Sequence, residues 1–399
     1  MKSEKNVLTI GFTAGTLFDM KDAEQIFEKA DEAEKQKLYR TFFKEMNERN
    51  EIFKPGPALG LYMAFQNLKS KIEGYQKDDS VIVKPNLKIR FGLSSKFDSA
   101  HPGAITLFNS LEHYMMKENE HNFPDYINLT GGFEQASPHK IQDADLVFTS
   151  SNDSANLYYN NGIASVFIPN RTPKLNLDSY RNRKSNLNIY CDYDGVIGDA
   201  NSESVFQAAL QITGIDPVNT FRDHEVSKSR EPMELGPLGD VLKKFGYIVE
   251  FYKDQLMANK IKEDEIPFKT ILLTARGGGA SARAFHTLSQ KEISLSQCLF
   301  MDGVNKNEAL SMVHKKDITL FLDDGEKHFH RAMTLDNIIP GYVPNELTVG
   351  NINMHEQLEK LTSSLRQNAL LSEKEMKVKN ESHNEKIGVK PQKSTTKNT

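Results

Sequence analysis

The chain has 399 residues, with 50 Lys and Arg against 54 Asp and Glu, and a formal net charge of −4. At about 150 residues per domain this length predicts two or three domains, and the balanced charge excludes a general binder of nucleic-acid polymers. The two cysteines, Cys191 and Cys298, exclude a disulfide framework and favour a reducing, cytoplasmic compartment. No apolar run approaches the roughly 20 residues that span a bilayer, so we expect no membrane partner.

Short apolar or β-branched runs bounded by Gly, Asp, Ser or Thr predict strands, in chain order at 7–12, 88–93, 145–148, 164–168, 187–191, 270–273, 298–301 and 318–322. Helical patterns lie between them at 23–50, 59–73, 204–213, 238–244 and 280–290. This alternation indicates an α/β fold with a mainly parallel sheet. In such sheets functional groups gather at the carboxyl ends of the strands.

The two halves of the chain also resemble each other. Segments that start at Leu8, Lys54, Ile89, Ile127 and Asp145 resemble, in the same order, segments that start at Leu187, Glu234, Thr270, Leu299 and Asp317. We therefore predict two tandem Rossmann-like units, at 1–170 and 187–345, joined by a polar, basic linker at 171–186. The alternative is that βα segments are alike in any α/β protein.

Three further regions complete the predicted organisation. Within the second unit, about 200–268 leave room for a small helical cap that covers a substrate and excludes water. Residues 346–371 are predicted to form a C-terminal helix. Residues 372–399 are rich in Lys and Glu and poor in large apolar side chains, which predicts a disordered tail.

The candidate chemistry lies in the second unit. Asp192 and Asp194 follow the apolar run 187–191, and side chains two apart on an extended chain point to the same side. Two adjacent carboxylates repel each other, so a metal ion, a lysine or a shared proton must balance them. The competing interpretation of Asp-x-Asp-Gly alone is an ordinary turn after a strand.

Three more elements follow at later strand ends. Thr274 ends one strand and is followed by Arg276 and a glycine run that opens a helix, an arrangement that favours phosphate. Lys306 comes soon after the next strand, and Asp323 and Asp324 end the last one. Together the four elements supply a carboxylate nucleophile, oxygen ligands for Mg²⁺, a hydroxyl and a cation, as phosphoryl transfer requires.

In this order the four elements resemble the haloacid dehalogenase superfamily of phosphohydrolases. Further motifs resemble the type I cytosolic 5′-nucleotidase family: TLFDM at Thr16, PGPA at Pro55, LTGG at Leu129, GPL at Gly236, LLTAR at Leu272 and FLDD at Phe321. This resemblance covers both halves. It implies haloacid dehalogenase-like folds and Mg²⁺-dependent hydrolysis of nucleoside 5′-monophosphates in the cytoplasm.

The resemblance implies a role for each carboxylate. Asp192 would attack phosphorus and become an aspartyl-phosphate, and Asp194 would act as general acid and then as general base. Mg²⁺ would be held by the Asp192 carboxylate, the Asp194 carbonyl and Asp324. Asp323 would support the metal or pair with Lys306.

The resemblance implies that the remaining site residues bind the phosphate. Thr274 and Lys306 would hold its oxygens, and Arg276 would either assist them or brace the following helix. The nucleotide is the expected partner, and a homo-oligomer is left open. Two alternatives are a phosphatase of the same superfamily for a sugar phosphate and a catalytically silent nucleotide sensor.

The first unit lacks these groups. By the repeat, the predicted counterparts of Asp192, Asp194, Thr274, Lys306, Asp323 and Asp324 are Thr13, Gly15, Ser94, Glu134, Ser151 and Asn152. Without the paired carboxylates, we expect this unit neither to bind Mg²⁺ in that manner nor to form a phosphoaspartate. It is then a structural partner of the catalytic unit or a site for a regulatory nucleotide.

Overall fold

The computed structural model describes residues 6–29, 31, 34–81, 83–117, 120–170 and 186–349, together with 363 and 367. The predicted linker, C-terminal helix and tail lie outside these residues, apart from 186, 346–349, 363 and 367. No helix in the described part of the chain is both long and apolar enough to cross a membrane.

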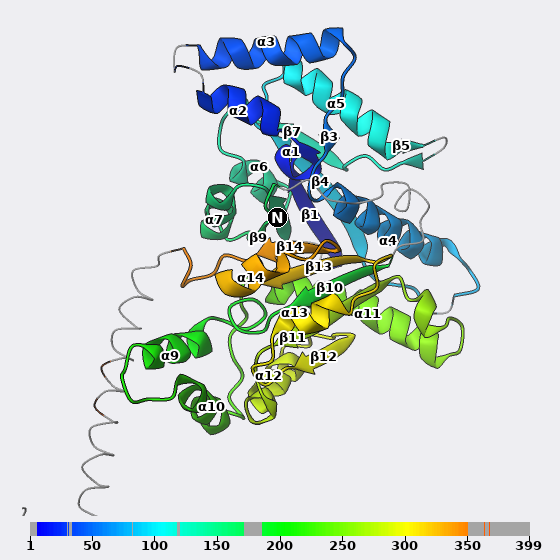
Figure 1. Cartoon of the computed structure of the whole chain (residues 1–399). Coiled ribbons are helices and arrows are strands. Elements are labelled where there is room, and N and C mark those ends of the chain that lie inside the picture. The colour runs from blue at the N-terminus through cyan, green and yellow to red at the C-terminus, as the bar shows by residue number, and fades with distance from the viewer. Residues whose placement is uncertain are drawn as a thin grey trace, which may run out of the picture.

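A ten-stranded sheet forms the centre of the molecule (Figure 1). Its strands lie in the order β12 (Gln297–Phe300), β11 (Phe268–Thr274), β10 (Leu187–Cys191), β13 (Ile318–Asp323), β14 (Ile338–Tyr342), β9 (Ala164–Phe167), β8 (Leu146–Thr149), β1 (Val7–Thr13), β4 (Lys88–Ser95) and β7 (Tyr126–Leu129). Neighbouring strands are parallel except β14 and β9, which pair antiparallel at Tyr342 and Phe167. The predicted α/β fold with a mainly parallel sheet is confirmed.

The two halves of this sheet have the same strand order. Reading outward from the antiparallel pair, one side runs β14, β13, β10, β11, β12 and the other runs β9, β8, β1, β4, β7. In each half the first strand in the sequence lies in the middle, flanked by the second and fourth. The two predicted units therefore share one continuous sheet, joined edge to edge at β14 and β9.

Backbone hydrogen bonds correct the predicted correspondence between the halves. The nitrogens of Thr130 and Met301 donate to Ser95 and Thr274 respectively, so Ser95, not Ser94, occupies the place of Thr274. Repeat segments that alternate apolar and polar residues look alike after a shift of one position, and only the backbone ladder fixes the register.

The fourth strand of each half needs a similar correction. The nitrogens of Ile168 and Val343 donate to the carbonyls of Thr149 and Asp323. Thr149 and Ser150 therefore stand where Asp323 and Asp324 stand, in place of the predicted Ser151 and Asn152. The shift arises because β13 has six residues and β8 has four, although each begins directly after an aligned aspartate, Asp317 or Asp145.

Helices cover the sheet. In the first half they are α1 (Ala14–Leu17), α2 (Lys21–Lys29), α3 (Lys35–Glu48), α4 (Leu59–Lys77), α5 (Pro102–Met115), α6 (Ala136–Ile141) and α7 (Asn152–Asn160). In the second they are α9 (Asn201–Leu210), α10 (Pro217–Ser227), α11 (Gly239–Met257), the 3-10 helix η1 (Glu263–Glu265), α12 (Gly278–Gln290), α13 (Lys306–Ser311) and α14 (Glu326–Ala332). The single helix predicted over 23–50 is thus two helices, α2 and α3.

Two short antiparallel pairs lie outside the main sheet. They are β2 (Phe18–Asp19) with β3 (Lys54–Pro55), and β5 (Met116–Lys117) with β6 (Glu120–His121).

The equivalent helices α4 and α11 bind the two halves together. Helix α4 belongs to the first half but contacts β10 and β13 of the second, while α11 contacts β1 as well as its own β11. The rings of Phe65 and Phe245 stack between these helices with centroids 6.0 Å apart. Lys244 donates to Asp145 at 2.6 Å and to the carbonyl of Val7 at 2.7 Å. One buried apolar core consequently runs through both halves.

The region predicted as a cap is smaller than 200–268. Figure 1 shows α9 and α10 standing beside α12, away from the sheet, and these two helices pack on each other and α10 packs on α12. Helix α11 lies against the sheet and belongs to its covering layer. We use "cap" below for α9 and α10.

Candidate active site

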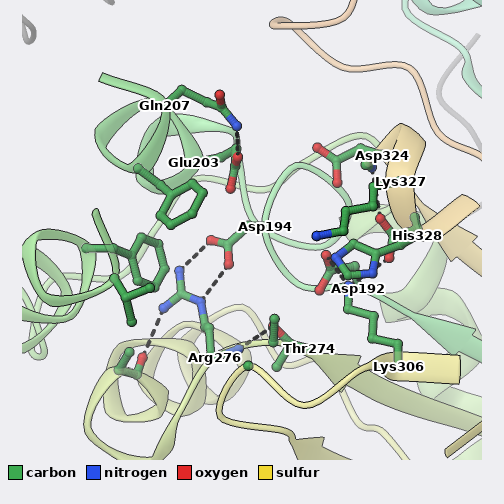
Figure 2. A pocket seen from close by; sticks show the side chains of 18 of the residues that line it. Asp192, Asp194, Glu203, Gln207, Thr274, Arg276, Lys306, Asp324, Lys327 and His328 are labelled. Atoms are coloured by element: carbon green, nitrogen blue, oxygen red, sulfur yellow. Dashed lines mark hydrogen bonds and ion pairs between the residues drawn. The ribbon is translucent and has the colours of Figure 1, made fainter. Parts of the chain in front are cut away.

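The carboxyl ends of β10, β11 and β13 border a cavity of about 840 Å³ that the cap overhangs (Figure 2). Every site residue predicted from the sequence lines it: Asp192, Asp194, Thr274, Arg276, Lys306, Asp323 and Asp324. Parallel strands end at one edge of a sheet, and for that reason residues far apart in the sequence meet here.

A buried lysine joins two of the carboxylates. Lys306, the first residue of α13, is 1% exposed and places Nζ 2.6 Å from Asp192 Oδ2 and 2.7 Å from Asp323 Oδ2. Burial alone would lower the pKa of Lys306, but Asp192 and Asp323 raise it above its ordinary value. The lysine is therefore a fixed cation between the two strands.

Each oxygen of Asp323 already has one hydrogen-bond partner. Its Oδ2 accepts from Lys306 and its Oδ1 accepts from the backbone nitrogen of Gly325 at 2.8 Å. Asp192 is less enclosed: Oδ1 accepts from the nitrogen of Tyr193 at 2.8 Å, and Oδ2 faces Lys306.

Asp324 completes a cluster of three carboxylates whose oxygens lie within 4.8 Å of one another. Asn345 donates to Asp324 Oδ2 at 2.6 Å and orients it. Burial, with Asp323 and Asp192 nearby, raises the pKa of Asp324 well above its ordinary value. Among the described residues Lys306 is the one cation bonded to them, so the three carboxylates keep a formal excess of two negative charges, and the cluster could hold a metal ion.

The glycine after Asp194 is required by this geometry. Gly195 has φ of +68°, and a Cβ built there would lie 2.2 Å from Asp324 Oδ2. Any other residue would be strained in this backbone conformation and would displace the Asp324 carboxylate.

Asp194 lies apart from the cluster and pairs with Arg276. The guanidinium donates from Nε to Oδ2 at 2.8 Å and from Nη2 to Oδ1 at 2.5 Å. Its remaining Nη1 bonds Glu225 of the cap, which is fully buried and also accepts from Ser202 at 2.7 Å and from Arg283 at 3.0 Å. Two carboxylates share the charge of Arg276, and its Nη1 also donates to the carbonyl of Ala280 in the following helix at 3.0 Å. Whether it assists the phosphate or braces that helix stays a prediction.

Burial raises the pKa of Asp194 above its ordinary value, although Arg276 opposes this effect. Thr274, 1% exposed at the end of β11, accepts from the nitrogen of Arg276 at 3.3 Å. It lies beside the start of α12, as expected for a hydroxyl that meets a phosphate at a helix N-terminus.

Several cavity residues were not predicted from the sequence. Figure 2 shows Lys327 and His328, from the first turn of α14, near Asp192 and Asp324, with Glu203 and Gln207 of the cap on the other side. Burial raises the pKa of Glu203 to about 7 and lowers that of His328 to about 4. The first turn of a helix that follows a strand lies at the same edge of the sheet as the end of that strand. Lys327 and His328 could therefore have been predicted from their position just after the strand that ends at Asp323.

A model of the 5′-nucleotidase family matches residues 1–348. The human protein named cytosolic 5′-nucleotidase 1B is 24% identical over 342 residues, which are 84% of this chain and 48% of that protein. The chain thus spans about half the length of this curated relative. No solved structure matches.

The fold and the site define an α/β protein with an acidic, metal-competent cluster at the carboxyl edge of a parallel sheet. The family match covers nearly all of the described residues. The chain belongs to the 5′-nucleotidase family, a family of hydrolases.

Proposed function

We propose that the protein is a Mg²⁺-dependent 5′-nucleotidase that converts nucleoside 5′-monophosphates to nucleoside and phosphate through an aspartyl-phosphate. The observation that carries the proposal is the meeting of Asp192, Lys306 and Asp324 in one cavity. A carboxylate held beside a fixed cation is suited to attack a phosphate ester, because the cation attracts the phosphate oxygens.

We propose Asp192 and Asp324 as carboxylate ligands of the magnesium ion, with the Asp194 carbonyl beside them. Asp323 is assigned a supporting role, because its side chain is 1% exposed and bonded through both oxygens, whereas that of Asp192 is 13% exposed. Magnesium prefers such oxygen ligands and, when bound, neutralises charge that develops on the phosphate.

The proposed reaction has two steps. A carboxylate oxygen of Asp192 attacks phosphorus, the bond from phosphorus to the ribose 5′-oxygen breaks, and Asp194 gives that oxygen its proton. Water then attacks the phosphorus, Asp194 takes a proton from the water, and the bond to Asp192 breaks to release phosphate. The raised pKa of Asp194 suits a group that must carry a proton between the steps. Lys306 and Thr274 hold the phosphate oxygens throughout.

The broader setting is also part of the proposal. The shared strand order supports two haloacid dehalogenase-like copies of one unit, of which the second is catalytic and the first structural. A cytoplasmic location agrees with the two free cysteines and with the human relative named cytosolic.

Release of inorganic phosphate tests the proposal. The assay compares nucleoside 5′-monophosphates with sugar phosphates, in Mg²⁺ and after chelation. We expect Mg²⁺-dependent release with nucleotides preferred. A preference for sugar phosphates would favour the other superfamily phosphatases, and binding without release would indicate a nucleotide sensor.

A further inference from the structure

Cap helix α10 places two side chains against Arg276. Phe221 and Glu225 are four residues apart on α10, so they lie on one face of the helix. The ring centre of Phe221 lies 5.2 Å from the guanidinium of Arg276, whose Nη1 donates to Glu225. Helix α10 belongs to the cap, whereas Arg276 follows β11 at the edge of the sheet. The cap therefore contacts the strand-end site through an aromatic and a charged group.

Arg276 in turn determines how Asp194 points. Its Nε and Nη2 donate to the two carboxylate oxygens of Asp194 (Figure 2), and no further hydrogen bond reaches those oxygens within the described part of the chain. The guanidinium is planar and its N–H groups have fixed directions, so a rotation of Arg276 would turn Asp194 with it. The orientation of Asp194 thus depends on the groups that hold Arg276.

Glu225 holds the other end of that guanidinium as a buried anion. It is fully buried and accepts from Ser202 at 2.7 Å and from Arg283 at 3.0 Å, besides Arg276. Burial alone would raise its pKa, but Arg276, Ser202 and Arg283 lower the pKa below its ordinary value. Asp194 and Glu225 together balance the charges of the two arginines. A balanced and fully hydrogen-bonded network fixes a direction, which apolar packing of a cap does not.

We propose that Glu225 is a positioning residue, which orients Arg276 from the cap so that Asp194 faces the leaving oxygen of the substrate. The inference rests on the proposed function, in which Asp194 gives that oxygen its proton, and deepens it. If α10 moved away, Glu225 and Phe221 would leave Arg276, and Asp194 would lose its orientation as water entered. The cap thereby takes part in the acid step as well as covering the cavity.

Glu225→Gln keeps the size of the side chain but removes its charge. The test compares phenyl phosphate with para-nitrophenyl phosphate, two esters of similar size, of which the first releases the more basic oxygen and depends more on a proton donor. We expect kcat/KM for phenyl phosphate, divided by kcat/KM for para-nitrophenyl phosphate, to fall by about 10-fold, because the acid is misdirected. A residue that only supports the fold would change both values alike and leave this ratio as in wild type.

Asp223→Asn is the matched control. Asp223 lies on the same helix and loses the same charge, but its side chain is exposed and lines no part of the cavity. The ratio for this variant should stay within about 2-fold of the wild-type ratio.

A double variant tests the route through Arg276. In an Arg276→Met background the group on which Glu225 acts is absent, so adding Glu225→Gln should change the ratio by less than about 2-fold. A further fall of about 10-fold would show that Glu225 acts by another route and would overturn the inference.

Thermal unfolding establishes that each variant is folded. If Glu225→Gln does not fold, Glu225→Asp takes its place, because it keeps the charge and withdraws the carboxylate from Arg276 by one methylene. The ratio should then fall by about 3-fold. An unchanged ratio in the folded variant would overturn the inference.

The wild-type rates judge the proposed function, and the ratios judge the inference. A wild type that hydrolyses aryl phosphates but no nucleotides would refute the proposed substrate and leave the ratio test in force. An unchanged ratio in Glu225→Gln would overturn the inference even where nucleotides are hydrolysed. No release from any ester would overturn both, since no general acid would then act.

Discussion

The two halves of the sheet place different chemistry on the same backbone. Equivalent hydrogen bonds within each half identify which positions match. By this criterion Asp192, Thr274, Lys306, Asp323 and Asp324 of the second half correspond to the neutral residues Thr13, Ser95, Gln135, Thr149 and Ser150 of the first. The side chains of Glu134 and Asn305 each accept a hydrogen bond from the backbone nitrogen two residues later, so these two residues match. The counterpart of Lys306 is therefore Gln135, and not Glu134 as predicted. Each charged group among these five residues of the second half is therefore replaced by a neutral one in the first.

Asp194 has no acidic counterpart in the first half. A Cβ on Gly15 would lie 2.7 Å from Ser150 Oγ, just as one on Gly195 would meet the equivalent Asp324. Gly15 thus corresponds to Gly195, not to Asp194 as the repeat predicts. The first half is one residue shorter at this turn, with Ala14 where the second half has Tyr193 and Asp194, and it therefore lacks the carboxylate of the proposed general acid.

This comparison shows that the strand order does not depend on the charges. In the first half the hydroxyls bond one another or the backbone: Thr13 and Thr16 lie 2.6 Å apart, and Thr16 donates to the carbonyl of Phe148 at 3.2 Å. Within the described residues of the first half, no group of three or more His, Cys, Asp or Glu side chains could hold a metal ion. The second half instead places three carboxylates beside one bonded lysine, an arrangement that could hold a metal ion.

The largest contrast should come from Asp192→Asn. The variant keeps the shape of the side chain but removes the nucleophile, so we expect phosphate release to fall by about 10,000-fold or more. The matched change in the first half, Thr13→Ala, should leave the rate within about 2-fold. Circular dichroism and thermal unfolding establish that both variants are folded. A near wild-type rate for Asp192→Asn would refute the mechanism.

Arg276→Met should have the next largest effect. It frees Asp194, and we expect hydrolysis of nucleotides, which release a poor leaving group, to slow by about 100-fold. An aryl phosphate, whose leaving group needs no proton, should slow much less. A variant that loses equal rate on both esters would mean that Arg276 only supports the fold. Phe97 occupies the same position in the first half, so Phe97→Leu is the control.

Asp324→Asn should weaken the binding of Mg²⁺ more than it lowers the activity of the enzyme at saturating Mg²⁺. We expect the Mg²⁺ concentration for half-maximal activity to rise by about 10- to 100-fold, because one proposed ligand loses its charge. Ser150→Ala, at the equivalent position, should leave it unchanged. An unaltered Mg²⁺ requirement in Asp324→Asn would remove Asp324 from the metal site.

A smaller effect concerns stability and pH. His139 is fully buried in the first half, against Gly11 and 2.9 Å from Ser94, and burial lowers its pKa to about 4. The unfolded chain, with a pKa near 6.5, binds the proton first. The free energy of unfolding should therefore fall by about 2 kcal/mol between pH 7 and pH 5 through this group alone.

The matched residue in the second half is Leu310, which is also fully buried. His139→Leu should remove this part of the pH dependence, as urea unfolding at the two pH values would detect. If the free energy of unfolding of His139→Leu still fell by the same amount between pH 7 and pH 5, His139 would not be the responsible group.

The smallest effect is expected from Ser94→Ala and Thr13→Ala on regulation. If the first half is only structural, added nucleoside di- or triphosphates should act on these variants as they do on wild type. Loss of any such activation would support the alternative of a regulatory nucleotide in this half.

Part of this arrangement could be predicted from the sequence. Asp192, Thr274, Lys306 and Asp324 follow apolar runs, and parallel strands bring such ends together without further information. The joining of both halves through β14 and β9 could not be predicted, because edge pairing depends on the whole surface of each half. The ion pair between Arg276 and Glu225 could not be predicted either, because Glu225 lies on a cap helix whose position no local sequence pattern determines.

A crystal soaked with Mn²⁺ and beryllium fluoride tests the central claim most directly, because beryllium fluoride mimics a phosphoryl group on an aspartate and Mn²⁺ gives an anomalous signal. We predict trifluoroberyllate on Asp192 and one Mn²⁺ peak between Asp192 and Asp324, with neither at Thr13 nor Ser150. A peak in the first half, or none beside Asp192, would contradict the account.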